Sequence, residues 1–120
     1  MTAWKLVQAV ICSAIALGLG IGPAGCHSKP ELTPQEAAGK HLYDVRCAHC
    51  HDDNDLNLKK VPPNLRGLFS HSTLPSGAPA TDVQVQTVIL AGKGMMPSFN
   101  GRFTDQQMSA LLAYLHIGLQ

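Results

Sequence analysis

The stretch Cys47-Ala48-His49-Cys50-His51 determines how the rest of the chain is interpreted. Two thiols separated by two residues on a tight turn can both reach the vinyl groups along one edge of a haem. The adjacent His51 can then direct its imidazole at the iron, for which neutral imidazole is an established ligand. Cys-x-x-Cys-His is the attachment signature of haem c, so this spacing predicts one haem bound covalently through Cys47 and Cys50.

Two other interpretations of the cysteine pair are weaker. A redox dithiol in a thioredoxin-like fold needs a strand before the motif and a longer chain than this one. A zinc site needs four ligands, usually from a second Cys or His pair, and His71 and His116 lack that paired spacing.

A second informative stretch is GKGMMPSF, residues 92–99. Methionine sulfur is a good sixth ligand for haem iron. Pro97 biases the residue before it to an extended backbone, which holds that side chain in one direction. We therefore predict Met96, rather than Met95, as the distal ligand. His71, in a long loop, is the alternative ligand, whereas Met108 is expected in the core.

The first 25 residues differ from the rest of the chain. Residues 1–5 are weakly positive, and residues 6–22 contain only Gln8 and Ser13 as polar side chains. A core helix would need a polar face, and a membrane span takes roughly 20 apolar residues. This pattern predicts an export signal peptide over residues 1–25, with a retained membrane anchor as the alternative.

The cysteine count draws attention to Cys26. The chain has four cysteines, and Cys12 lies within the predicted signal. If Cys47 and Cys50 carry haem, Cys26 is the odd one left in an exported protein.

Cys26 follows Ala24-Gly25, which resembles the lipobox of bacterial lipoproteins, although Pro23 departs from the aliphatic residue usual there. The resemblance implies a lipidated Cys26, residues 26–32 as a polar tether and residues 33–120 as the folded domain. A free or intermolecular thiol is the alternative.

The charge of the exported chain is balanced. The whole sequence has nine Lys and Arg and eight Asp and Glu, and loss of Lys5 leaves eight of each. Phosphate binding relies on a basic surface, so nucleic acid is not an expected partner. Without a strongly basic face, docking driven mainly by one-sided charge is not expected either.

Three segments begin with a helix-capping pattern, Thr followed three residues later by Glu or Gln, at residues 33–36, 81–84 and 104–107. They predict helices from Pro34 to about Arg46, from the cap at Thr81 to Gly92, and from the cap at Thr104 to Gly118. The apolar side of the first is predicted from Ala38, Leu42, Tyr43 and Val45, and that of the last from Met108, Leu111, Leu112 and Leu115.

The segment between the motif and residue 80 is rich in Pro and Gly and predicts a loop. Residues 64–69 are expected to form a short helical turn, and no run alternates as a strand does. So long a loop is unusual in a small domain unless it wraps a large apolar object, which a haem supplies.

These features together resemble the class I cytochrome c family over residues 34–119. Gly39 and Tyr43 match the small and aromatic positions of its first helix. Cys47, Cys50 and His51 match its haem site. The matching stretches further along the chain are Pro63-Asn64-Leu65-x-Gly67-Leu68, Met96-Pro97 and Leu111-Leu112-Ala113-Tyr114-Leu115.

The resemblance implies an all-α cytochrome c fold, in which three to four short helices and a long loop surround one covalent haem. It implies that the first and last helices cross at Gly39, Leu111 and Tyr114, and that the Pro63 carbonyl accepts a hydrogen bond from His51. Family members often use a Trp near the haem propionates. With Trp4 lost in the signal, Arg66 and Lys93 are the candidates for that role.

We therefore predict a monohaem electron carrier or electron-transfer subunit, not an enzyme. It would be a monomer exported to a bacterial periplasm or the outer face of a membrane, with a redox protein donor and acceptor. Ligation by His51 and Met96 leaves the iron no open position. The alternatives are a haem sensor or enzyme with an open or labile sixth position, and a non-haem module that uses Cys47 and Cys50.

Overall fold

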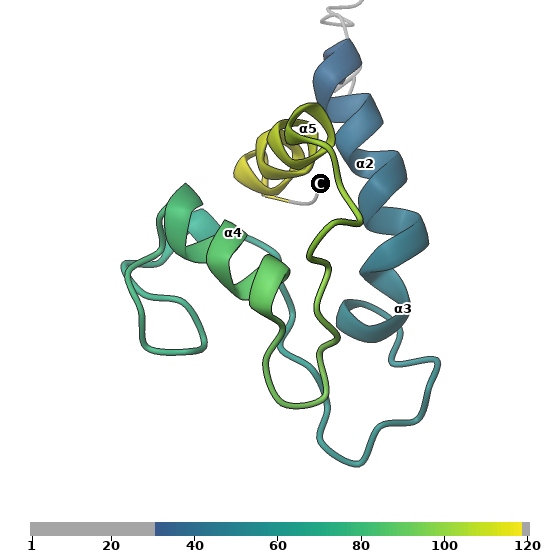
Figure 1. Cartoon of the computed structure of the whole chain (residues 1–120), viewed down its shortest axis with the longest axis vertical. Coiled ribbons are helices and arrows are strands. Elements are labelled where there is room, and N and C mark those ends of the chain that lie inside the picture. The colour runs from purple at the N-terminus through teal and green to yellow at the C-terminus, as the bar shows by residue number, and fades with distance from the viewer. Residues whose placement is uncertain (1–30, 119–120) are drawn as a thin grey trace, which may run out of the picture. The chain divides into compact units, whose positions relative to one another are not determined.

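The computed structural model describes residues 31–118, which form four α-helices and one 3₁₀ helix (Figure 1). In chain order these are α2 (Pro34–Arg46), α3 (Ala48–His51), η1 (Leu68–Ser70), α4 (Asp82–Ala91) and α5 (Asp105–His116). Within this part of the chain there is no strand, only isolated bridges such as Thr73 with Pro79. The predicted signal, Cys26 and most of the predicted tether lie outside the described residues.

The three predicted helices begin at their predicted caps. Thr33 Oγ1 accepts a hydrogen bond from the Glu36 amide at 3.3 Å, and the Glu36 carboxylate accepts one from the Thr33 amide at 2.7 Å. Thr104 and Gln107 form the same reciprocal pair at the start of α5, at 3.2 and 2.9 Å. At α4, Thr81 Oγ1 accepts from an amide without the return bond. Each cap satisfies amides that the first turn of a helix leaves without partners.

The core forms where α5 lies across α2 (Figure 1). A Cβ atom placed on Gly39 would lie 1.9 Å from the Ala110 carbonyl oxygen and 2.9 Å from Tyr114 Cβ, so only glycine permits this approach. Tyr43 and Leu111 are each 1% exposed beside the crossing. The rings of Tyr43 and Tyr114 lie 5.6 Å apart. The predicted crossing of the first and last helices is confirmed.

The predicted apolar side of the first helix is too broad. Val45 is 48% exposed, Ala38 is exposed, and Leu42 is only half-buried. The reason is that α2 buries only Gly39 and Tyr43, one turn apart, so apolar residues beside that narrow stripe stay outside the contact. In α5 the prediction holds, and Met108 is buried at 4% exposure.

The predicted helical turn over residues 64–69 is displaced. Asn64 Oδ1 accepts a hydrogen bond from the Arg66 amide at 2.8 Å, which makes a side-chain turn where a helix would need main-chain bonds. The helical turn is therefore confined to η1. The four-residue helix α3 was not predicted.

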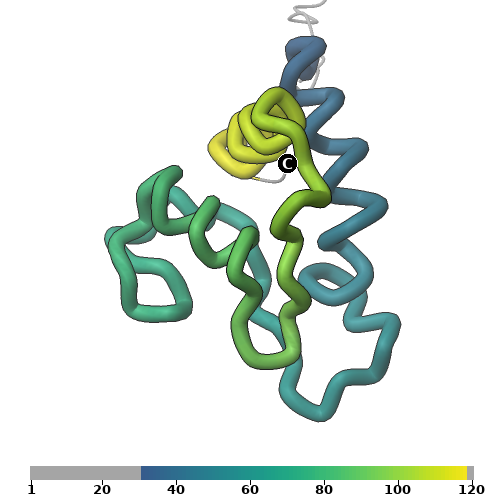
Figure 2. Tube along the Cα trace, in the orientation of Figure 1, coloured from purple at the N-terminus to yellow at the C-terminus, as the bar shows by residue number. Residues whose placement is uncertain are grey.

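Two long connections complete the domain (Figure 2). Residues 52–81 lead from α3 to α4, and residues 92–104 lead from α4 to α5; both pass between α3 and α4 in this view. Leu68 and Leu74 anchor the first connection in the core, and Phe99 anchors the second. The two segments predicted to hold the haem therefore lie in or beside irregular chain supported by a helical core.

Candidate functional site

Residues 47–51, here called the attachment turn, form the corner after α2. The Cys47 amide donates to the Tyr43 carbonyl at 2.8 Å and ends α2, and the Cys47 carbonyl then accepts from Cys50 and His51 at 3.1 and 2.9 Å. Both cysteines are free thiols of intermediate burial. Burial raises the pKa of the Cys47 thiol to about 11, so this sulfur stays protonated at neutral pH.

The ring of His51 is oriented by a main-chain carbonyl. His51 Nδ1 lies 2.7 Å from the Pro63 oxygen. A carbonyl can only accept, so Nδ1 carries a proton, and in the neutral ring the lone pair is then on Nε2. This is the hydrogen bond that the family resemblance implied. It favours the tautomer in which Nε2 is available to bind a metal.

The segment over residues 92–99, here called the distal segment, contains a tight turn. The Lys93 amide donates to the Met96 carbonyl at 3.1 Å, and the Met96 amide donates back to the Lys93 carbonyl at 3.0 Å. Gly92 makes the turn possible: its φ is +72°, and a Cβ there would lie 2.6 Å from the Met96 oxygen.

The turn separates the two methionines. Met95 is 59% exposed, whereas Met96 is partly buried and packs against the hydrophobic core. Two further hydrogen bonds tie the distal segment to α4: Ser98 Oγ donates to the Leu90 carbonyl at 2.6 Å, and the Phe99 amide donates to the Ile89 carbonyl at 3.1 Å. The thioether of Met96 is thus the one held towards the inside.

The other described histidines lie at the surface. His41, His49, His71 and His116 are all exposed. His49 pairs with Asp55 at 2.9 Å, and His116 pairs with Asp82 at 2.6 Å while stacking on Phe69 at 3.8 Å. Across residues 31–118, no three His, Cys, Asp or Glu side chains come together as a metal-binding group, so the zinc interpretation finds no ligand set there.

One contact at the site was not predicted from the sequence. The hydroxyl of the buried Tyr43 donates to Asp52 Oδ1 at 2.8 Å, next to the attachment turn. Asp52 directly follows His51 but matches no motif, and no periodicity pairs residues nine apart. Only the bend between α2 and α3 brings them together.

The donor groups fit a haem c. Two free thiols lie on one corner, an imidazole nitrogen beside them has its lone pair available, and a thioether is held inward on another segment. Partly buried apolar side chains pack against the core, among them Ala48, Leu65, Phe69, Leu90 and Phe103.

Comparisons with known proteins agree with this fold and donor set. Residues 34–115 match the family described as cytochrome c oxidase, cbb3-type, subunit III. Cytochrome c6 of Thermostichus vulcanus is 31% identical over 117 residues, which cover 92% of this chain and 89% of that protein. The cbb3-type oxidase subunit CcoP of Azospirillum brasilense is 33% identical over 84 residues, but these cover 65% of this chain and only 26% of that longer protein.

A solved structure supports the fold. Cytochrome c6 from the diatom Phaeodactylum tricornutum aligns with a TM-score of 0.52 at 24% identity, covering 68% of this chain and 91% of that one. The all-α cytochrome c fold is therefore confirmed. The chain belongs to the class I, monohaem c-type cytochromes. Membership implies a covalently bound haem c and a role in electron transfer.

The length and hydropathy of the described helices can be compared with what a membrane span requires. Among residues 31–118, none is long and apolar enough to cross a bilayer.

Proposed function

We propose that this chain is an exported electron carrier whose single haem is attached to Cys47 and Cys50, with its iron ligated by His51 and Met96. The observation that carries the proposal is the 2.7 Å contact from His51 Nδ1 to the Pro63 oxygen. It holds the imidazole in the tautomer whose Nε2 can bind iron, beside two free thiols at attachment spacing.

The residues of the site hold the cofactor and leave no position for a substrate. When bound, the haem supplies an iron that gains or loses one electron. His51 and Met96 would both hold the iron, and neither redox state would then have an open position for oxygen or a substrate. Because Pro63 restrains the His51 ring and the turn at Lys93 restrains Met96, we expect the site to change little between the two states. These properties suit electron transfer rather than catalysis.

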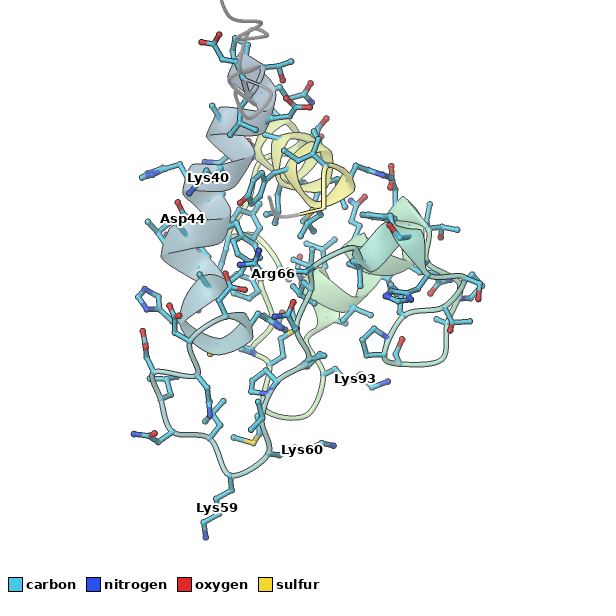
Figure 3. The ribbon with its side chains drawn as sticks, turned by 180° about the vertical axis from the view of Figure 1, so that it is seen from behind. Lys40, Asp44, Lys59, Lys60, Arg66 and Lys93 are labelled. Carbon is cyan, nitrogen blue, oxygen red and sulfur yellow. The ribbon has the colours of Figure 1, made fainter. Side chains whose placement is uncertain are left out.

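Electrons would enter and leave where the two connections meet the surface. Exposed apolar side chains there include Leu56 at 65%, Val61 at 68% and Met95 at 59%. Figure 3 shows Lys59 and Lys60 on the first connection and Lys93 on the second, in the same part of the view. We propose that redox proteins dock there chiefly through apolar contact, with Lys59 and Lys60 at the rim. Arg66 and Lys93 stay the proposed partners of the propionates.

The optical spectrum of the oxidised holoprotein tests the ligation. Methionine ligation gives a weak far-red charge-transfer band. We expect the wild type and Met95→Ala to show it, and Met96→Ala to lose it and to bind carbon monoxide readily when reduced. Haem staining after denaturing electrophoresis tests the covalent attachment. A colourless wild-type band, or a wild type that lacks the far-red band and binds carbon monoxide, contradicts the proposal and favours a non-haem module or an open-site haem protein respectively.

The location of the chain forms a separate part of the proposal. Residues 1–25 are proposed as an export signal and Cys26 as a lipidated N-terminus that holds the carrier at a bacterial membrane. Intact mass after expression in an exporting host tests this. Diacylglycerol on Cys26 is expected, and cleavage elsewhere with an unmodified Cys26 rules out the anchor but leaves the carrier untouched.

A further inference from the structure

Tyr43 contacts both ends of the attachment turn. Its carbonyl accepts the Cys47 amide at 2.8 Å, and its hydroxyl donates to Asp52 at 2.8 Å, directly after His51. The side chain of Tyr43 is 1% exposed. The buried Tyr43 is therefore hydrogen-bonded to Cys47, the first residue of the attachment turn, and to Asp52, the residue directly after the turn.

The position of this hydroxyl is set by the helical core and not by the turn. The Tyr43 ring packs 5.6 Å from the Tyr114 ring, at the crossing that Gly39 permits. Burial, and next the hydrogen bond to Asp52, raise the pKa of Tyr43 well above its usual value, so the hydroxyl remains a donor at neutral pH.

Asp52 transmits this restraint to the proposed iron ligand. It ends α3, where its amide donates to the Ala48 carbonyl at 2.8 Å. It is bonded directly to His51, whose ring is restrained on the other side by Pro63. Pro63 fixes the ring of His51, but Pro63 itself is exposed and lies in the long connection. Main-chain bonds through Cys47 also connect the turn to α2. The link through Asp52 adds a side-chain hydrogen bond from the buried core to the residue that follows His51.

We propose that Tyr43, through its hydrogen bond to Asp52, is a positioning residue for His51. It fixes the main chain of the attachment turn, and it holds the Asp52 carboxylate as a stationary negative charge beside the iron ligand. The inference rests on the proposed haem ligation, to which it adds a link from the helix crossing to the iron. A fixed negative charge near the iron stabilises the oxidised state and so lowers the reduction potential.

A pair of tyrosine variants tests the positioning. Tyr43→Phe keeps the ring and removes the hydroxyl, while Tyr114→Phe does the same to a neighbouring buried tyrosine that is not hydrogen-bonded to Asp52. In the oxidised holoprotein we expect Tyr43→Phe to move the hyperfine-shifted proton signals of His51 and the haem methyl groups. It should also speed hydrogen exchange of the amides over residues 47–52. Tyr114→Phe should leave both as in the wild type.

The charge is tested by a double-mutant cycle on the midpoint potential. Asp52→Asn removes the carboxylate charge, so we expect it to raise the potential. Asp52 is an exposed residue whose carboxylate the Tyr43 hydroxyl holds in one position. In the Tyr43→Phe background the carboxylate is free to turn further into solvent, where water and salt screen it more fully. The same Asp52→Asn change should then raise the potential by a smaller amount.

The outcomes separate this inference from the proposed function. Equal shifts from Asp52→Asn in both backgrounds, or an unchanged His51 signal in Tyr43→Phe, overturn the positioning role even if stability falls. If Tyr43→Phe yields no holoprotein, Asp52→Ala decides, because alanine has no oxygen to accept the Tyr43 hydroxyl. Wild-type exchange over residues 47–52 in that variant overturns the role, and faster exchange supports it. Failure of the proposed function is seen in the wild type itself, as absent haem staining or an absent far-red band.

Discussion

From the crossing of α2 and α5 we predict how much Gly39→Ala changes the free energy of unfolding. Gly39 has helical neighbours and no positive φ, so in an open helix alanine would stabilise the protein by about 1 kcal/mol. Here the new Cβ would meet the Ala110 oxygen at 1.9 Å, about 1.5 Å short of the 3.4 Å at which ordinary contact begins. The obstructing atom belongs to the main chain of α5, so it cannot rotate away, and the helices must separate.

Separation weakens the packing of the most buried residues. Tyr43 and Leu111 lie at this contact, and a gap of about 0.5–1 Å already loses a quarter to a half of a dispersion contact. Overpacking costs about 1–3 kcal/mol and occasionally more. A clash this deep with a main-chain atom belongs at the upper end of that range, which exceeds the gain of about 1 kcal/mol in helix propensity. We expect Gly39→Ala to lower the free energy of unfolding by roughly 2 kcal/mol, which corresponds to a fall of about 10 °C in melting temperature.

Urea unfolding of the holoprotein, followed by far-ultraviolet circular dichroism, measures this loss. Gly101→Ala is the control, because a Cβ there meets nothing within 4 Å and the residue has a φ of +70°. This variant reports only the cost of placing an alanine in the left-handed backbone region, roughly 1 kcal/mol. A Gly39→Ala protein as stable as the wild type, or more stable, would refute the close crossing.

Two further predictions concern the caps and alkaline pH. Thr104→Ala and Thr81→Ala each remove one cap hydrogen bond and should each cost about 1 kcal/mol in urea unfolding. Gln107→Ala should cost more than Gln84→Ala, because of these two residues only Gln107 accepts a bond from the amide of its cap; equal losses from the two Gln changes would contradict the capping box. For Tyr43, burial and the Asp52 hydrogen bond raise the folded-state pKa above 10.0. The native state therefore retains the Tyr43 proton at pH values where the unfolded chain loses it. The contribution of Tyr43 to the free energy of unfolding is complete below pH about 10 and falls as the pH rises further. Between pH 8 and about 11, the free energy of unfolding should fall less steeply with pH for Tyr43→Phe than for the wild type. The same slope in both proteins would contradict the raised pKa of Tyr43.

The helices could be predicted from the sequence because their signals are local. Thr33 with Glu36, and Thr104 with Gln107, each lie within one turn, and the structure contains both reciprocal pairs. The close approach of another backbone at Gly39 could also be predicted. Glycine destabilises a helix interior, so a glycine there is expected where close packing offsets that loss. For such features a few neighbouring residues decide the outcome.

What could not be predicted depends on residues distant in sequence or space. Val45 fits the apolar pattern of α2 but is 48% exposed, because the crossing selects a stripe of only Gly39 and Tyr43. The bond from Tyr43 to Asp52 depends on how α3 turns after α2, and α3 itself has four residues and no side-chain cap. A nine-residue separation that matches no helical or strand repeat leaves no trace in the sequence pattern.

The two halves of the proposed haem site are supported by different parts of the domain. His51 is linked to the α2–α5 core through Asp52 and Tyr43, whereas Met96 is linked to α4 through the bonds of Ser98 and Phe99 to its last turn. A helix of ten residues such as α4 is too short to be stable alone, and it depends on the contacts that hold it to the core. A haem ligated from both sides would add a bond between these parts. Cofactor binding would then serve both electron transfer and the joining of α4 to the rest of a small domain.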